Sequence, residues 1–505
     1  MVMQAGPSDQ SGMCRLFHFR WDVRPYGGLT AALRKATNGG QDDDRGDAQG
    51  CSGTAEVTPV LHDQTGPRTA AATSTGARAT TGRAAAYRTG GTASVPGSRR
   101  SPSARSSSAR HVPGLLLVCA IAFSSQWAPS TTNRYGAAVA LVAVLVSCRA
   151  PRLLPPDLLA AGTAVWASVA LFWAADFDTA LPMAYLYGAA CAMFIAVRHV
   201  VRSRAALFAV GYAFLAGCVG TAVELITNPI PNSVQARDSV MDFSIRYGVD
   251  GVNYNYTAYS LAAGVVLAAV LMLLGPSTKV EWLGIVAAAG LLFWGVLLTG
   301  TRGALISVLV GAAYLLLSTV AARLARTVAV VTVPIVLIAV PLGLYRVLSS
   351  EMLWLDGAFA GRATGDLSGR LYIWPYAVSS WAESPILGIG PGMLTATGSL
   401  AVGAHNLLLS VGNDLGLVGV VLYGGILTFA VIVPFRHPSP AFGRAAGVFL
   451  VSQTPIWLTG HWEASPVCFV ALALVSVAPV ALRTAASGAG RKAAPRHAAP
   501  PVRAW

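Results

Sequence analysis

The sequence predicts an all-α polytopic membrane protein with about twelve transmembrane helices. Of its 505 residues, 54% are hydrophobic and only 11% are charged, and from residue 113 onward the hydrophobic residues form long runs. An average soluble domain carries about 25% charged residues, and about 20 consecutive apolar residues cross a bilayer. We therefore expect the lipid bilayer to surround most of the chain.

The apolar runs set the expected order of helices along the chain. Most of them have nearly the length that a bilayer requires, and the first two are short. The expected spans are residues 113–127, 135–148, 157–174, 181–197, 205–225, 256–275, 281–298, 303–321, 327–345, 407–433, 442–460 and 465–482. The chain thus divides into an N-terminal extension at 1–110, a transmembrane domain at 111–485 and a cytoplasmic tail at 486–505.

The N-terminal extension differs in composition from the rest. Residues 1–110 are rich in Ser, Arg, Gly, Ala and Thr and lack periodic apolar residues. Such a segment cannot bury enough surface to offset the entropy lost on ordering. Since no signal-peptide hydrophobic region precedes residue 113, we expect a disordered basic cytoplasmic extension. A mis-assigned start codon is the alternative explanation.

The charge distribution favours membrane topology over nucleic-acid binding. The formal net charge is +14, but much of the positive charge lies in the first 110 residues, the tail and the short loops. With a cytoplasmic N-terminus, the cytoplasmic loops carry Arg149, Arg152, Arg198, Arg202, Arg204, Lys279, Arg323, Arg326, Arg436 and Arg444. Short loops on the other side hold only Arg134 and Arg302. The positive-inside rule then places both termini in the cytoplasm, in a multi-pass protein of the cytoplasmic membrane. The seven cysteines show no metal-ligand spacing, so we expect neither disulfides nor a zinc site.

Two connections are too long to be simple turns, and this topology makes both extracytoplasmic. They cover residues 226–255 and residues 346–406. Long ordered loops in compact proteins usually carry function. Within the second loop, "GRLYIWPYAVSSWAES" is expected to form a short helix along the membrane interface, because Trp and Tyr suit the headgroup boundary.

Two arginines on the outer side have a functional and a structural interpretation each. Arg302 lies between two spans, where an arginine needs an anionic partner or access to water; the alternative is a snorkelling arginine at a helix start. Arg370 lies in the large loop, where its planar guanidinium can hold two phosphate oxygens. Its alternative is a salt bridge with Asp366 or Glu383.

His405 is the only histidine of the large loop. An imidazole can take a proton near neutral pH, so His405 is a candidate general base towards a hydroxyl. The alternative is a helix-end histidine beside a capping Asn406. The glycines of "LGIGPGM" at 387–393 predict tight backbone turns rather than a phosphate loop, because Pro391 and the context do not fit one. The sequence leaves open whether Asn413, Asp414, Glu224, His461 and Glu463 have structural or substrate roles.

Taken together, these motifs follow a recognisable order. "TGTRG" lies between two spans; a long loop then carries "GRLYIW" and "SPILGIGPG"; "AHN" opens a span that continues "LLLSVGNDLGLVGVVLYGGIL". This order resembles the O-antigen ligase and polymerase-like family of membrane glycosyltransferases, over about residues 250–433.

The resemblance implies a GT-C-like helical fold and a metal-independent, inverting glycosyltransferase without a cofactor. The donor would be a glycan on a polyprenyl pyrophosphate such as undecaprenyl pyrophosphate, and the acceptor a glycan or other hydroxyl. The family's two pyrophosphate-binding arginines fall on Arg302 and Arg370, and its catalytic histidine falls on His405. Arg246, Asn255 and Asn406 are further substrate-binding candidates. Where relatives show Asn-Pro-Asn, this chain reads "NYNYTAY" at 253–259.

The sequence therefore predicts glycan transfer or polymerisation at the outer face of the cytoplasmic membrane, in cell-surface polysaccharide assembly. Partners would include other envelope assembly proteins and no nucleic acid. It does not separate a ligase from a polymerase or a protein glycosylase. A polytopic transporter or flippase of envelope precursors is the main alternative, and a scaffold of an envelope complex is another.

Overall fold

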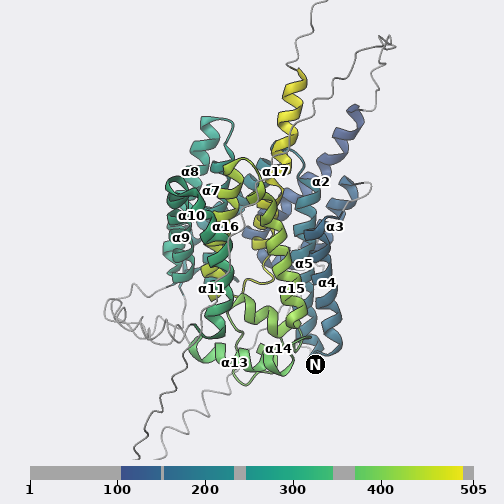
Figure 1. Cartoon of the computed structure of the whole chain (residues 1–505), viewed down its shortest axis with the longest axis vertical. Helices are drawn as coiled ribbons and strands as arrows, with labels where there is room; N and C mark the ends of the chain where they lie inside the picture. The colour runs from purple at the N-terminus through teal and green to yellow at the C-terminus, as the bar shows by residue number, and fades with distance from the viewer. Residues whose placement is uncertain (1–103, 149–152, 232–245, 345–369, 493–505) are drawn as a thin grey trace, which may run out of the picture. The chain divides into compact units, whose positions relative to one another are not determined.

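The computed structural model describes residues 104–148, 153–231, 246–344 and 370–492. These residues fall within one compact unit, residues 95–505, and they are helical almost throughout (Figure 1). The expected N-terminal extension lies outside the described residues up to residue 103, and so does the end of the tail from residue 493. Helix α2 begins at Ala104, inside the range expected to be disordered, and α17 continues through Lys492, inside the expected tail.

The first half of the domain contains α2 (Ala104–Trp127), α3 (Pro129–Ser147), α4 (Pro155–Val169) with the short η1 (Ala170–Phe172), α5 (Phe177–Val200), α6 (Arg204–Thr227), α7 (Tyr254–Leu274) and α8 (Lys279–Thr299). The second half contains α9 (Arg302–Val320), α10 (Ala322–Thr327), η2 (Val328–Thr332), α11 (Val333–Ala339), η3 (Val340–Leu344), α13 (Arg370–Glu383), α14 (Met393–Ala396), α15 (Leu407–Arg436), α16 (Pro440–Thr459) and α17 (Pro466–Lys492). Every apolar run identified in the sequence coincides with one of these helices or with a series of these helical pieces.

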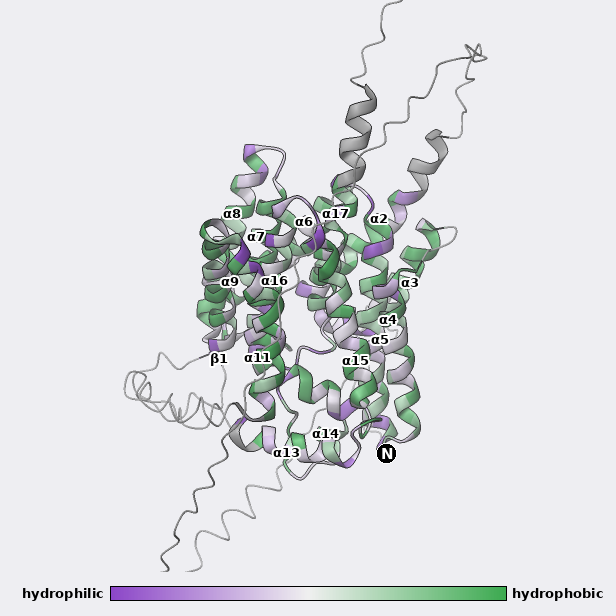
Figure 2. Cartoon of the chain, in the orientation of Figure 1, coloured by the Kyte–Doolittle hydropathy of each residue, from purple (hydrophilic) through white to green (hydrophobic). Residues whose placement is uncertain are grey.

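Eight of the described helices are long and apolar enough to cross a membrane. They are Pro155–Phe172, Phe177–Val200, Arg204–Thr227, Tyr254–Leu274, Lys279–Thr299, Arg302–Val320, Ala322–Gly343 and Leu407–Arg436. His111–Trp127 and Pro466–Leu482 are shorter apolar helices. Figure 2 shows hydrophobic residues along most of the length of the helices. The chain is a multi-pass helical membrane protein, as predicted, and the count of twelve crossings stays a prediction.

Local sequence signals explain where several helices begin. The side chain of Asp176 accepts hydrogen bonds from the first turn of α5, and Ser203 caps α6 in the same way. Thr278 and Glu281 form a reciprocal capping box at the start of α8. Such caps satisfy backbone N–H groups that have no partner inside the helix.

The first long connection is closed by a very short sheet. Strand β1 (Ile230–Pro231) pairs antiparallel with β2 (Tyr247–Gly248), with Ile230 opposite Gly248. Residues 232–245 between them lie outside the described residues. The pairing brings Arg246 close to the start of α7.

A buried polar cluster joins three helices. Arg198 Nε of α5 donates to Asp157 Oδ1 of α4 at 2.6 Å, and His199 Nε2 lies 3.4 Å from Asp157 Oδ2. Arg198 also donates to Ser476 Oγ of α17. Charges inside a membrane domain are costly unless they are paired, so this cluster holds α4, α5 and α17 in register.

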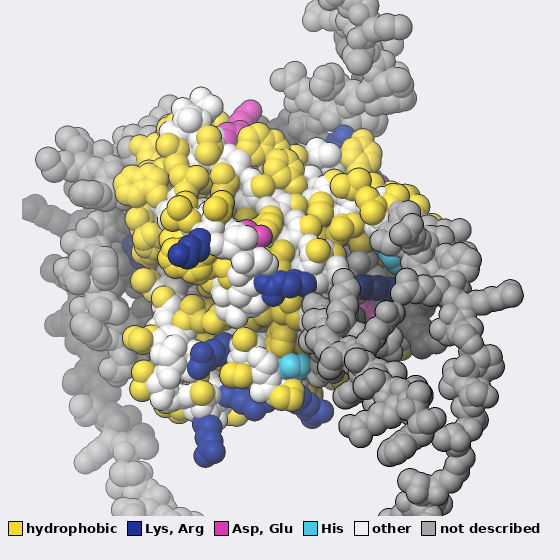
Figure 3. All heavy atoms as spheres, turned by 90° about the horizontal axis from the view of Figure 1, so that it is seen from above, with side chains coloured by type: hydrophobic (Ala, Val, Ile, Leu, Met, Phe, Trp, Pro, Cys, Tyr) yellow, Lys and Arg dark blue, Asp and Glu magenta, His cyan; other side chains and the backbone are white. Residues whose placement is uncertain are grey.

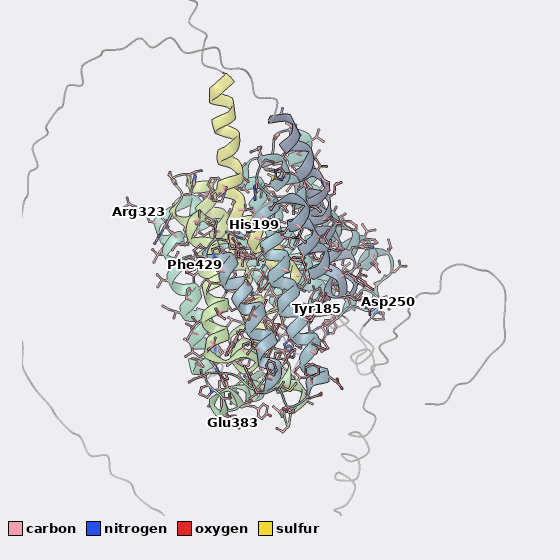
Figure 4. The ribbon with its side chains drawn as sticks, turned by 90° about the vertical axis from the view of Figure 1, so that its right-hand side faces the viewer. Tyr185, His199, Asp250, Arg323, Glu383 and Phe429 are labelled. Atoms are coloured by element: carbon pink, nitrogen blue, oxygen red, sulfur yellow. The ribbon has the colours of Figure 1, made fainter. Side chains whose placement is uncertain are left out.

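The two ends of the helix bundle differ in charge. One end carries the helix termini that hold Arg198, Arg202, Arg204, Lys279, Arg323, Arg326, Arg436 and Arg444, and Figure 3 shows Lys and Arg side chains spread over it. The other end carries α13 and α14 (Figure 1). In Figure 4, Glu383 of α13 lies at the lower end of the view and Arg323 lies toward the upper end.

The amphipathic segment of the large loop forms a helix, as expected. Trp374 of α13 is 2% exposed, and its Nε1 donates to the carbonyl of Ala404 at 3.1 Å. Ala377 and Leu409 belong to the same small apolar cluster. Helix α13 therefore packs directly against the turn that carries His405.

Candidate active site

The six candidate residues come from segments at one end of the bundle, the end that carries α13 and α14. Arg246 precedes α7, and Asn255 lies in its first turn. Arg302 begins α9, Arg370 begins α13, and His405 and Asn406 directly precede α15. The alternating directions of the helices bring these sequence-distant positions to the same face of the membrane domain (Figure 1).

His405 has an unusual backbone conformation. Its φ is +48°, in the left-handed region that residues other than glycine rarely adopt. Such a conformation costs about 1–3 kcal/mol and persists only where its surroundings impose it. Here the next residue, Asn406, caps α15 through its side chain, which accepts from Leu409 N at 3.1 Å, and Ala404 is held by Trp374. The strained turn fixes where the imidazole lies.

His405 faces a second histidine. Its ring centroid lies 4.1 Å from that of His461, with 48° between the ring planes. His461 lies in the link between α16 and α17, and its Nδ1 is 3.6 Å from Glu463 Oε1. The Glu463 side chain is only 5% exposed, whereas that of His461 is 43% exposed. The site therefore contains a histidine pair with a carboxylate behind one member.

The two imidazoles have opposite tendencies to hold a proton. Burial, together with the nearby charges of His461 and Arg370, lowers the pKa of His405 to about 3. For His461, burial also lowers the pKa, but the neighbouring Glu463 carboxylate, with a contribution from Asp414, outweighs this effect and raises the pKa above its usual 6.5. At neutral pH His405 is thus a neutral imidazole, and His461 is the more basic of the two.

A cavity of about 460 Å³ lies beside the histidine pair. Its polar lining includes Tyr256, Ser410, Asp414, His461, Glu463 and Ser465. Small-molecule sites usually have volumes of 300–1,000 Å³ with a few placed polar groups. The cavity therefore has the size and the lining to receive a sugar unit.

The wall of this cavity is fixed by the glycine-rich segment and α15. Gly388, Gly390 and Gly392 all have positive φ, at 75°, 107° and 74°, which confirms the tight turns expected there. The N–H of Gly392 donates to Asp414 Oδ1 at 2.9 Å, and Tyr187 Oη donates to Asp414 Oδ2 at 3.0 Å. Asp414 thus joins the turn to α5 and α15.

The side chain of Asn413, the neighbour of Asp414, is hydrogen-bonded to backbone carbonyls. Its Nδ2 donates to the carbonyl of Ala377 at 2.9 Å and to that of Leu409 at 2.8 Å. The bond to Ala377 joins α13 to α15, and the bond to Leu409 lies within α15. Of the two polar residues that the sequence left open, Asp414 lines the cavity and Asn413 holds the helices together.

Arg370 lies next to the histidine pair. Its Nη2 donates to the carbonyl of Thr459, the last residue of α16, at 2.7 Å, and its charge acts on both His405 and His461. Asp366, one of the alternative partners considered for this arginine, lies outside the described residues. The position of Arg370 allows an anion bound at the site to contact it.

The start of α9, where Arg302 lies, packs against the end of α16. Gly303 packs so closely on α16 that a Cβ there would lie 2.6 Å from Thr459 Oγ1. The Arg302 side chain itself is exposed at the start of α9. The structure thus places both predicted clamp arginines around the end of α16, and a snorkelling role for Arg302 remains an alternative.

Arg246 and Asn255 lie further along the same end. Arg246 lies over the ring of Tyr254 at 5.0 Å, and its buried Nε has no hydrogen-bond partner among the described residues. A Cβ on Gly300, two residues before Arg302, would meet Arg246 Cγ at 3.4 Å. Asn255 Oδ1 lies 3.4 Å from Thr301 Oγ1. These contacts connect the start of α7 with the start of α9.

Asn406 differs from the other candidates because its side chain is occupied. It is 1% exposed, its Oδ1 caps α15, and its Nδ2 lies 3.5 Å from the carbonyl of Leu458. This geometry supports the capping role considered from the sequence, and a substrate contact for Asn406 stays a prediction. Among the described residues, no group of three or more His, Cys, Asp and Glu side chains is placed to hold a metal ion.

Comparison with known families assigns the central part of the chain. Residues 287–424 match the family model described as O-antigen ligase. The matched segment contains Arg302, Arg370, His405 and Asn406, and it excludes His461 and Glu463. No curated protein matches the chain. The resemblance inferred from the motif order is thereby confirmed over these residues.

Proposed function

Because residues 287–424 match the O-antigen ligase family, we propose that the protein transfers a glycan from a polyprenyl pyrophosphate to an acceptor hydroxyl at the outer face of the cytoplasmic membrane. The family match itself supports a membrane glycan-transfer role in polysaccharide assembly. One observation carries the finer proposal: His461, which lines a cavity of sugar size, lies against His405, and Arg370 lies near both rings although it is distant from His461 in sequence.

His405 would act on the acceptor. Its imidazole is neutral at physiological pH because burial lowers its pKa to about 3, so a ring nitrogen is free to take the hydroxyl proton. The hydroxyl oxygen attacks the anomeric carbon from the face opposite the pyrophosphate, and the configuration inverts. The bound pyrophosphate would also raise the basicity of His405, because a nearby negative charge favours the imidazolium.

The arginines would hold the pyrophosphate. The bond between the anomeric carbon and the pyrophosphate oxygen breaks with its electron pair, so negative charge grows on the leaving group. Guanidinium groups fixed at the border of a low-dielectric region stabilise that charge more than groups in open water do. Arg370 and Arg302 around the end of α16 suit this role, and the buried Nε of Arg246 adds a further donor.

An apolar groove offers a place for the lipid tail. It has a volume of about 670 Å³ and is lined by α11, α15 and their neighbours. Leu407 and Leu408, next to His405, lie at one end, and Arg326 and Arg436 lie at the other. An isoprenoid chain could therefore remain among apolar side chains while its pyrophosphate reaches the histidine pair.

The location of the polar cluster supports transfer over transport. Transporters place their substrate sites near the bilayer midplane on broken helices. Here the histidine pair and the arginines lie at helix ends. The basic residues gather at the opposite end, which supports an extracytoplasmic site and cytoplasmic termini.

The proposal is tested with the purified protein and lipid-linked glycans extracted from cells in which the gene is deleted. Wild type should move the glycan to added cell-surface polymer, and the product should have the inverted configuration. His405→Asn should transfer at least 10²-fold more slowly, whereas His437→Asn, in the link before α16 at the opposite end, should match wild type. Equal rates for both variants would contradict the role of His405.

The proposed mechanism uses no metal ion, since arginines neutralise the leaving group. Transfer by the purified protein should therefore continue after treatment with EDTA. Loss of activity that Mg²⁺ restores would show this part of the mechanism to be wrong.

A further inference from the structure

His461 and Glu463 lie outside the segment that matches the O-antigen ligase family, yet both line the cavity beside His405. The Glu463 carboxylate lies 3.6 Å from Nδ1 of His461. This arrangement favours the tautomer in which Nδ1 carries the proton and Nε2 carries a lone pair. A carboxylate in this position also stabilises the imidazolium that forms when Nε2 takes a proton.

We propose that His461 and Glu463 form the proton-accepting pair of the site: the proton that His405 takes from the acceptor hydroxyl passes to His461. The inference rests on the proposed glycan transfer. It adds to that proposal two positioning residues and a route for the proton.

Contact between the two histidine rings supports transfer of the proton from His405 to His461. Ring centroids 4.1 Å apart, with 48° between the ring planes, put the two imidazoles in van der Waals contact. An in-plane N–H···N bond places the centroids roughly 5 Å apart, so the proton passes after the His461 ring turns or through a water at the ring edges. A Cβ on Gly403 would lie 2.0 Å from His461 Cε1 and 2.6 Å from Nε2. The Nε2 edge of His461 therefore lies directly against the turn that carries His405, and position 403 has no space for a side chain.

The charges around His461 also favour transfer of the proton from His405 to His461. Glu463 acts from its own link, Asp414 from α15, Arg370 from α13, and His405 from the turn before α15. The two carboxylates outweigh the arginine and burial, so the pKa of His461 is raised, whereas that of His405 is lowered to about 3. A proton taken by His405 therefore moves to the more basic ring, provided that His461 is neutral beforehand.

The acceptor O–H bond breaks and an N–H bond forms on His405, while the hydroxyl oxygen bonds to the anomeric carbon and the pyrophosphate leaves with the electron pair. His405 then gives the proton on its other nitrogen to Nε2 of His461 and returns to the neutral form. The side chain of His461 is 43% exposed, so the proton can leave to water.

The test is the pH dependence of kcat/KM, which reports groups of the free enzyme. The pyrophosphate of the donor is esterified at both ends and does not titrate near neutral pH. Wild type should lose activity on the acid side with an apparent pKa above 6.5, because a protonated His461 cannot accept. Glu463→Gln removes the interaction that raises this pKa, so its acid limb should move to lower pH, and Glu463→Asp should restore it in part.

Two further variants complete the test. His461→Gln should lower kcat by about 10²- to 10⁴-fold with little change in the binding of undecaprenyl pyrophosphate. Gly403→Ala displaces the His461 ring without removing a polar group, so it should lower kcat in the same way. If Glu463→Gln does not fold, the kcat of Gly403→Ala decides whether His461 accepts the proton.

The two possible failures are distinguishable. If wild type transfers no glycan from the extracted lipid-linked donor, the proposed function fails. If wild type transfers glycan while the acid limb of Glu463→Gln stays in place, or while His461→Gln or Gly403→Ala keeps the wild-type kcat, only the proton-accepting pair is overturned.

Discussion

The imidazole rings of His405 and His461 lie with their centroids 4.1 Å apart, although one residue precedes α15 and the other follows α16. The fold brings them together because α13 holds the turn of His405 from one side and Gly403 gives space to His461 on the other. Among the described residues, only Glu463 places a carboxylate oxygen within 4 Å of a nitrogen of either ring. The pair is therefore asymmetric, and this asymmetry leads to separate predictions for each histidine.

The backbone of His405 predicts how substitutions at this position affect stability. At a φ of +48°, a β-branched residue is disfavoured by about 1–2 kcal/mol, whereas glycine adopts this region freely. His405→Val should therefore unfold at a lower temperature than His405→Gly, and both should be inactive. Thermal unfolding in detergent measures the difference. Equal unfolding temperatures would show that the turn relaxes and stores no strain.

Acidification should weaken the fold through His405. Its folded pKa of about 3 lies below the usual value of about 6.5. The unfolded chain therefore binds a proton at His405 that the folded protein does not, and stability falls as the pH drops from about 6.5 towards 3. His405→Asn should lose less stability than wild type between pH 7 and pH 5. Parallel pH profiles of the unfolding temperature would count against a buried neutral imidazole.

Arg370 should bind pyrophosphate through its planar fork as well as its charge. Arg370→Lys keeps the charge but cannot form two parallel hydrogen bonds. Loss of one charged hydrogen bond costs about 1.5–3 kcal/mol, which is a factor of about 10–150 in Kd. Binding of undecaprenyl pyrophosphate should weaken accordingly, while Arg323→Lys at the opposite end serves as the matched control. An unchanged Kd for Arg370→Lys would remove it from the clamp.

The orientation in the membrane can be checked at two exposed serines. Ser399, between α14 and α15, belongs to the end with the candidate site, and Ser277, between α7 and α8, belongs to the basic end. In a background without native cysteines, Ser399→Cys should react with an impermeant thiol reagent in intact cells. Ser277→Cys should react only after the membrane is permeabilised. The reverse pattern would invert the topology.

The sequence predicts the helices well because hydropathy is a local property. Each apolar run became helical, and the Trp- and Tyr-containing segment after residue 369 became α13. Start positions were less predictable: α2 begins at Ala104, where Ser and Arg dominate the sequence. The tight turns at the three glycines before α14 also follow from residue type alone, and their positive φ values agree with this prediction.

The site could be predicted only in part, because its contacts are long-range. Motif order identified Arg302, Arg370 and His405, but nothing local indicates that His461 lies against His405 or that Glu463 is buried behind it. The sequence also left Asp414 unassigned, and its bonds to Gly392 and Tyr187 depend on the packing of three separate segments. Their only local signal was the presence of ionisable residues in or beside apolar spans.

The most direct test of glycan transfer at this site is the pool of lipid-linked glycan in cells that carry His405→Asn or the control His437→Asn at matched membrane levels. Transfer by the site predicts that polyprenyl-linked glycan accumulates and surface polymer is lost in His405→Asn, with wild-type pools in the control. The length of the accumulated glycan then separates a polymerase, which leaves single repeat units, from a ligase, which leaves long chains. Wild-type pools in His405→Asn would contradict the proposed function and make His405 a structural residue of the turn before α15.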